Sequence, residues 1–209
     1  MSSIPQSSTA GLHPQPAWRA ARQRRILLAA MEVLRAEPER GISMDRIAAA
    51  AGVGKATLYR YFGTKEALLR ACLQEVIDEL GTRMEAAEES AAAPPDRLRG
   101  ILACMAETFS QHLLPLRLVT RHHRELDEAW RWWVRDARQR LVTVLRRHFE
   151  RGMASGDYNA VDLALVPHMV MGMIRSGVTH TELPAGALSE RIAAFVLRAC
   201  GGKAKERSA

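Results

Sequence analysis

Apolar residues recur every three or four positions along most of the chain, which is the spacing that places them on one face of an α-helix. In the stretch from Trp18 to Ala36, this apolar face is formed by Ile26, Ala30, Val33 and Leu34. The same spacing predicts further helices over residues 44–51, 65–88, 96–113, 115–123, 126–155, 163–174 and 187–200. Alternation typical of strands is rare, so the pattern predicts an all-α fold.

Both ends of the chain lack this period. Residues 1–17 are rich in Ser, Pro and Gln, and residues 201–209 read GGKAKERSA, so both segments are predicted to be disordered. Within the apolar run of 163–174, Pro167 is expected to kink or locally loosen its helix. Adjacent Glu88 and Glu89 lie on a charge-rich helix and are interpreted as solvated surface.

The segment from Ile47 to Leu69 is interpreted as two helices joined by a tight turn. Gly52 would supply the left-handed backbone that such a turn needs, and Ser43 is expected to cap the first of the two helices. In the short second helix, Leu58 and Phe62 point inward together. This is a helix-turn-helix arrangement, with one supporting helix and one exposed helix.

The exposed side of the short helix carries side chains that suit duplex DNA. It holds Lys55, Ala56, Thr57, Tyr59, Arg60 and Tyr61. A helix fits the major groove, where Lys and Arg donate to guanine and an Ala methyl contacts a thymine methyl, while hydroxyls suit phosphate oxygens. Thr64 is expected to cap the next helix, whose first N–H groups and Lys65 would attract another phosphate.

The charge distribution agrees with this interpretation. The formal net charge of the chain is +7, which indicates an anionic partner, although solubility alone would also explain it. Between Trp18 and Glu66 there are ten Lys or Arg against five Asp or Glu, a net charge of +5 in less than a quarter of the chain. Such a concentration is typical of nucleic-acid binding.

The sequence GISMDRIAAAAGVGKATLYRYFGTKEALL resembles the DNA-binding domain of the tetracycline-repressor (TetR) family over about Arg24 to Leu73. Gly54 stands where the family often has Ser, and Ala56 where it often has Gly. The resemblance implies a homodimeric regulator, usually a repressor, that binds a near-palindromic operator. Carried over position by position, it implies DNA contacts by Ser43, Arg46, Lys55, Ala56, Thr57, Tyr59, Arg60, Tyr61 and Lys65.

The resemblance also implies a division of the chain. Residues 18–66 would form a three-helix helix-turn-helix DNA-binding domain, and residues 67–200 a helical effector-binding and dimerisation domain. Dimerisation is expected through the last two long helices, at Val170, Gly172, Ile174, Ile192, Phe195 and Val196. A fully intramolecular role for these residues is the alternative.

A small, largely apolar effector is expected inside the C-terminal helices. The candidate lining residues are Met105, Phe109, His112, Trp130, Trp133, His168 and Met171. Met and Trp suit an apolar or aromatic ligand, and a His would fix a polar group. The same residues also fit the description of ordinary core, since they recur at helical spacing.

Other classes of function have less support. Three widely spaced cysteines contain no CxxC pair, and we find no nucleophile–base set, so no metal site, cofactor or enzyme activity is expected. No apolar run reaches the length of a membrane span and no signal pattern is seen, so a cytoplasmic protein is expected. The alternative function is a DNA-binding protein of the same fold that has no small-molecule ligand and is regulated by protein partners.

Overall fold

The computed structural model describes residues 17–36, 43–112 and 128–201, which form eight α-helices and no strand. The helices are α1 (Ala17–Ala36), α2 (Met44–Ala50), α3 (Lys55–Phe62), α4 (Lys65–Glu89), α5 (Pro94–Gln111), α7 (Glu128–Ala154), α8 (Val166–His180) and α9 (Ala185–Ala199). The predicted all-α fold is confirmed. The predicted helix over 115–123 lies outside these ranges, as do residues 1–16 and 202–209 of the predicted disordered tails, whereas Ala17 is the first residue of α1.

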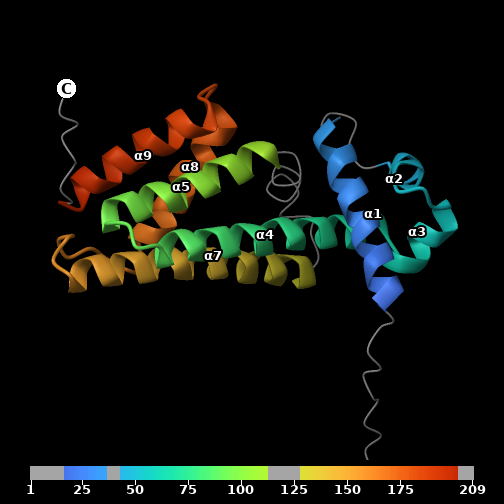
Figure 1. The fold of residues 1–209 in the computed structure, drawn as a ribbon, viewed down its shortest axis with the longest axis horizontal. Coiled ribbons are helices and arrows are strands. Elements are labelled where there is room, and N and C mark those ends of the chain that lie inside the picture. Colours follow the sequence, from blue (N-terminus) through green and yellow to red (C-terminus); the bar gives the residue numbers. More distant parts are fainter. Residues whose placement is uncertain (1–16, 37–42, 113–127, 202–209) are drawn as a thin grey trace, which may run out of the picture.

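Two apolar cores lie one after the other along the molecule. The first joins α1, α2, α3 and the start of α4, with Ile26, Ile47 and Leu58 fully buried. The second joins the rest of α4 with α5, α7, α8 and α9. Figure 1 shows α1 to α3 gathered at one end of the molecule and the C-terminal helices at the other.

Helix α4 takes part in both cores. Its first turns bury Leu68 and Cys72 against α1 to α3, and its later turns bury Leu80 and Met84 in the C-terminal core. Within each of these two pairs the residues are four positions apart, which places both on the same face of the helix. Helix α4 therefore connects the two cores directly.

Helix α5 lies at the centre of the C-terminal bundle, where it contacts α4, α7, α8 and α9. It starts at a pair of prolines, which suit the first turn because their missing N–H groups would have no partner within the helix. Leu98, Ile101, Leu102 and Met105 are fully buried along it. The helix is thus a core element that the surrounding helices cover.

The predicted kink at Pro167 is wrong. Helix α8 begins at Val166 rather than at Leu163, so Pro167 lies in its first turn, where proline is tolerated. None of the helices in the three described ranges is long and apolar enough to cross a membrane.

Candidate DNA-binding surface and C-terminal pocket

The turn between α2 and α3 is built from local interactions. Oγ of Ser43 accepts a hydrogen bond from the Arg46 N–H at 3.4 Å, so the predicted N-cap of α2 is confirmed. Helix α2 ends where the Val53 N–H bonds to the Ala48 carbonyl at 2.9 Å, and Gly52 takes a φ of 62°. A left-handed backbone of this kind favours glycine. The chain then enters α3 with Gly54 as its N-cap, without a side-chain hydrogen bond.

Helix α3 separates into two faces, as predicted. Leu58 is fully buried and Phe62 is 9% exposed, and both belong to the N-terminal core. Lys55, Ala56, Tyr59 and Arg60 are exposed, and Thr57 and Tyr61 are half-buried. The helix therefore presents a strip of polar and cationic side chains to solvent, supported from behind by two large apolar anchors.

Tyr61 has a second role that the sequence did not predict. Its ring packs against the N-terminal core. The guanidinium carbon of Arg19, on α1, lies 5.7 Å from the centre of the same ring. A cation over an aromatic face is attracted to it, so Arg19 and Tyr61 hold α1 and α3 together at the edge of this surface.

Helix α4 starts directly beside α3. Gly63 has a φ of 72°, and Oγ1 of Thr64 accepts a hydrogen bond from the Ala67 N–H at 3.0 Å. The predicted cap at Thr64 is thus confirmed, and Lys65, the first helical residue, is exposed. The positive end of α4 and the Lys65 ammonium are placed where an anion on α3 would meet both.

Lys55 has an acidic partner that sequence inspection missed. Its Nζ lies 2.9 Å from Oδ1 of Asp45 in the first turn of α2. The hydrogen bond to Asp45 and the charge of this carboxylate raise the pKa of the Lys55 ammonium. Asp45 and Lys55 are ten positions apart, so no helical period relates the two residues.

Most of the predicted effector-lining residues are packed into the core. Met105, Phe109 and Met171 are buried in the C-terminal core. Trp133 and His168 are half-buried, and Nε1 of Trp133 donates to Oε1 of Gln74 at 2.6 Å. The side chain of Trp130 lies outside the described residues. These placements favour the ordinary-core interpretation for the first three residues.

His112 ends α5 rather than lying within it. Its backbone N–H bonds to the Thr108 carbonyl, and its side chain is half-buried. Burial lowers the pKa of the His112 imidazole, which favours the neutral form. A neutral imidazole both donates and accepts a hydrogen bond, so the proposed role of His112 in holding a polar group stays a prediction.

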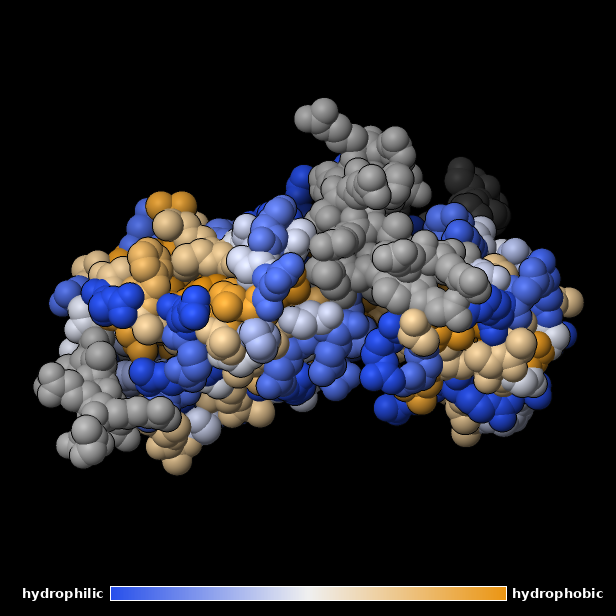
Figure 2. Space-filling model, turned by 90° about the horizontal axis from the view of Figure 1, so that it is seen from above, coloured by the Kyte–Doolittle hydropathy of each residue, from blue (hydrophilic) through white to orange (hydrophobic). Residues whose placement is uncertain are grey.

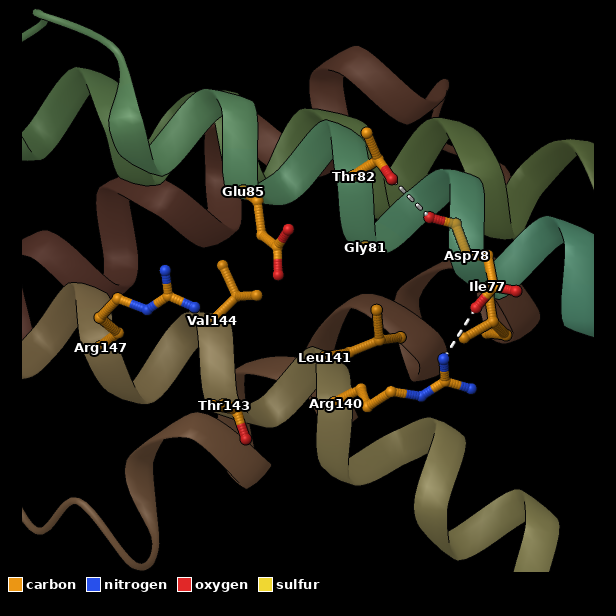
Figure 3. A pocket seen from close by; sticks show the side chains of 10 residues that line it. All are labelled: Ile77, Asp78, Gly81, Thr82, Glu85, Arg140, Leu141, Thr143, Val144 and Arg147. Carbon is orange, nitrogen blue, oxygen red and sulfur yellow. Dashed lines mark hydrogen bonds and ion pairs between the residues drawn. The ribbon is translucent and has the colours of Figure 1, made fainter.

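A pocket of about 360 Å³ opens between α4 and α7, away from the predicted lining residues. It is lined by Ile77, Asp78, Gly81, Thr82, Glu85, Arg140, Leu141, Thr143, Val144 and Arg147. Nη1 of Arg140 lies 2.8 Å from Oδ1 of Asp78 and closes one end. Figure 3 shows Glu85 and Arg147 extending from opposite helices toward the other end. The pocket volume is within the usual range for small-ligand sites.

The six predicted dimerisation residues divide into two groups. Val170, Ile174 and Val196 are buried in the core of their own chain, as the intramolecular alternative requires. Gly172 and Ile192 are half-buried, and Phe195 is 53% exposed.

Large apolar side chains are also exposed at the start of α8, the helix that packs against α9. Leu165 and Met169 are 53% and 50% exposed, and both lie at the start of α8. Figure 2 shows apolar side chains gathered over the part of the surface that α8 and α9 form. These two residues were missed, because the all-round apolar sequence of α8 does not show which of its faces the core covers.

Among the described residues, no group of three or more His, Cys, Asp or Glu side chains is arranged to hold a metal ion. The arrangement instead combines a cationic helix surface at one end of α4 with a pocket and an apolar surface at the other.

Both parts of the chain match known protein families. The family described as "Bacterial regulatory proteins, tetR family" matches residues 26–72, and the domain described as "Tetracyclin repressor-like, C-terminal domain" matches residues 91–179. The transcriptional regulator EthR of Mycolicibacterium smegmatis is 29% identical over 181 residues, which are 83% of this chain and 81% of EthR. The transcriptional regulator BetI of Brucella suis is 28% identical over 140 residues, 64% of this chain and 71% of BetI.

Solved structures agree in fold. The TetR-family regulator PfmR from Thermus thermophilus superimposes with a TM-score of 0.68 at 25% identity, over 87% of this chain and 100% of that one. FadR from Bacillus subtilis, solved with stearoyl-CoA, gives a TM-score of 0.69 at 22% identity, over 87% and 99%. The two family matches cover the N-terminal helices and most of the C-terminal helices of the chain in turn. This chain therefore belongs to the TetR family of helix-turn-helix transcriptional regulators.

Proposed function

We propose that this chain is a ligand-responsive repressor that binds a near-palindromic operator as a homodimer and is released by a small, largely apolar effector. In this proposal, residues 18–66 bind DNA and residues 67–200 bind the effector and the second subunit. The protein would act in the cytoplasm, where its operator lies.

The observation that carries the proposal is the exposed face of α3. Lys55, Ala56, Tyr59 and Arg60 are exposed on it, while Leu58 is fully buried. A helix anchored from behind by apolar residues presents its other face rigidly, which is what base reading in a major groove requires. The capped start of α4 beside it supplies N–H groups and Lys65 for the phosphate backbone.

Selection of preferred duplexes from a random pool tests DNA recognition. A two-fold dimer should select an inverted repeat with half-sites about 34 Å apart, one helical turn, or a multiple of it. Lys55→Ala should cost about 1–3 kcal/mol on the selected duplex and relax the base preference, because Lys55 is proposed to contact a base. Lys65→Ala is the matched comparison, and should weaken binding to all sequences alike. Equal losses for Lys55→Ala on selected and random duplexes would refute the base-reading role.

Dimerisation is supported by the apolar surface of α8 and α9. Met169 and Phe195 expose about half of their side chains there, and such apolar surface commonly marks an interface. Phe195→Arg should shift the protein toward monomer in sedimentation equilibrium and weaken binding to the inverted repeat. Leu28→Arg, which changes an equally exposed apolar residue on α1, should leave the subunit association unchanged.

Effector binding is supported by the pocket between α4 and α7. Its floor contains Ile77, Leu141 and Val144, and its rim is charged, which suits an amphipathic molecule with a largely apolar body. Because α4 also packs against α1 and α3, a ligand that prefers one position of α4 would change the relative positions of the two α3 helices in the dimer.

A thermal-shift screen of apolar and amphipathic compounds, followed by a DNA-release assay, tests the proposed effector binding. A compound that binds the native protein should raise the melting temperature and weaken operator binding. A Cβ at Gly81 would meet no atom within 4 Å, so Gly81→Leu should fold and fill the pocket, which would abolish the response. If no compound stabilises the protein, regulation by protein partners becomes the better account.

A further inference from the structure

One carboxylate stands within the cationic surface that α3 presents. The two oxygens of Asp45 lie 2.9 and 3.0 Å from Nζ of Lys55. The side chains are 71% and 52% exposed, so the pair lies on the outside of the molecule. Asp45 belongs to α2 and Lys55 to α3, and the turn at Gly52 brings them together.

The contact with Asp45 occupies the Lys55 ammonium, which is the group proposed to contact DNA. The Lys55 ammonium carries one charge and three donors, and both carboxylate oxygens are within hydrogen-bonding distance of it. To donate to a base edge or a phosphate, Lys55 has to move away from Asp45 or share its charge. The Asp45 carboxylate then faces the phosphates without its cation, which is unfavourable because like charges repel.

We propose that Asp45 competes with DNA for Lys55 and thereby weakens DNA binding. The inference rests on the proposed function, in which Lys55 contacts the duplex, and adds an opposing residue on the same surface. Exposed ion pairs are weak, so removal of the competitor should strengthen binding about two- to five-fold. Asp45 would thus ease release of the protein from DNA without contributing to the core.

A double-mutant cycle isolates this effect. Asp45→Asn keeps the shape of the side chain and removes its charge, and it is made both in the wild-type protein and in a Lys55→Gln background. Glu66→Gln is the matched control, since Glu66 is an acidic residue in the first turn of α4 as Asp45 is in the first turn of α2. Binding is measured by fluorescence anisotropy on the duplex selected above and on a mixed-sequence duplex. Thermal unfolding without DNA checks that each variant keeps its fold.

Asp45→Asn should tighten binding to the selected duplex about two- to five-fold beyond any gain from Glu66→Gln, and this excess should vanish in the Lys55→Gln background. On the mixed-sequence duplex, the freed Lys55 ammonium should make the binding constant fall more steeply with salt concentration. The change in slope should correspond to at most about one additional phosphate contact. The same gain in both backgrounds would show that Asp45 acts only by general repulsion and would overturn the inference. Weaker binding by Asp45→Asn would also overturn the inference, because it would mean that Asp45 positions Lys55 for DNA.

The cycle also separates this inference from the proposed function. If the wild-type protein binds selected and mixed-sequence duplexes equally weakly, the proposed function itself fails. If the wild-type protein discriminates between them and Asp45→Asn gives no gain that depends on Lys55, only the competition by Asp45 is refuted.

Discussion

Glu88 and His148 are joined by a buried hydrogen bond in which Oε2 of Glu88 lies 2.6 Å from Nδ1 of His148. Their side chains are 0% and 1% exposed. On its other side, Nε2 of His148 lies 2.8 Å from the hydroxyl of Tyr158, and Arg151 reaches Oε1 of Glu88 at 3.0 Å. Because Glu88 lies in the last turn of α4 and His148 belongs to α7, this network fixes the far end of the helix that also packs against the DNA-binding helices.

One placement of protons satisfies the whole network. Nδ1–H of His148 donates to the Glu88 carboxylate, and Nε2 accepts from the Tyr158 hydroxyl. Burial raises the pKa of Tyr158, so the hydroxyl keeps the proton that it donates. A buried network in which every group has a partner specifies one arrangement of the helices that carry it.

Removal of the Glu88 carboxylate should therefore be costly. Glu88→Ala leaves His148 without the acceptor for its buried N–H, and breaking a buried pair typically costs about 3–5 kcal/mol. Denaturant unfolding followed by circular dichroism measures the change. Glu89→Ala is the control: Glu89 is exposed and lies 3.9 Å from the Arg147 guanidinium, so a change within about 0.5 kcal/mol is expected. Equal effects of the two substitutions would contradict the role given to Glu88.

The same carboxylate predicts a dependence of stability on pH. Burial alone would raise the pKa of Glu88, but the hydrogen bond to His148 and the charges of Arg97 and Arg151 hold this pKa below its usual value. An unfolded Glu titrates near about pH 4.3. Since the folded-state pKa is lower, the contribution of Glu88 is fully present above about pH 5 and is lost as the pH falls through the folded-state value.

Unfolding free energies measured from pH 6 down to about pH 3 test this linkage. The wild-type protein should lose more stability over the acid range than Glu88→Gln, which has no carboxyl group to protonate at this position. Parallel acid profiles for the two proteins would show that Glu88 is not the group responsible.

The interpretation of Glu88 as solvated surface was wrong, and the reason is physical. Glu88 and Glu89 are adjacent on one charge-rich helix, and no local pattern separates them. What buries Glu88 is His148, which lies 60 residues later in the sequence. His148 recurs at helical spacing with the buried residues Leu141 and Val144 of α7, but a period along one helix does not show which polar residue of another helix it meets.

More of the helix-turn-helix than of the C-terminal domain could be predicted from the sequence, because the features that define it are local. The caps at Ser43 and Thr64 each involve an N–H three residues away, and the turn at Gly52 depends on its own backbone angle. The dimer and effector residues depend instead on how distant helices pack. Helix α8 carries apolar residues on all of its faces, so sequence alone did not separate buried Val170 from exposed Met169.

Gly152, near the end of α7, is required by the ring of Tyr158. A Cβ at this position would overlap Cδ2 and Cε2 of the ring. The ring cannot move away freely, because its hydroxyl is bonded to His148 and its centre lies 5.9 Å from that of Phe149. Overpacking of this kind costs about 1–3 kcal/mol, so Gly152→Ala should lower the melting temperature even though Ala favours helix.

Gly81→Ala is the matched comparison for this substitution. Gly81 lies inside α4, and an added Cβ there meets no atom within 4 Å. With no overlap, the helix preference of Ala should stabilise the protein by up to about 1 kcal/mol. A rise in melting temperature for both variants would mean that the Tyr158 ring yields, and that Gly152 is not needed for packing.

Gly52 sets the turn that presents α3. Its φ of 62° is a left-handed conformation, and a Cβ there would meet no atom within 4 Å, so the cost of a substitution is backbone strain alone. Gly52→Ala should destabilise the N-terminal core by about 1–2 kcal/mol, and Gly52→Asn by less, since Asn adopts this conformation more readily. Thermal unfolding and operator binding measured together on both variants test this order. If Ala is tolerated as well as Gly, the turn does not depend on a left-handed residue. If instead both properties fall in the order Gly, Asn, Ala, the backbone angle at this one position governs how α2 and α3 are held for DNA.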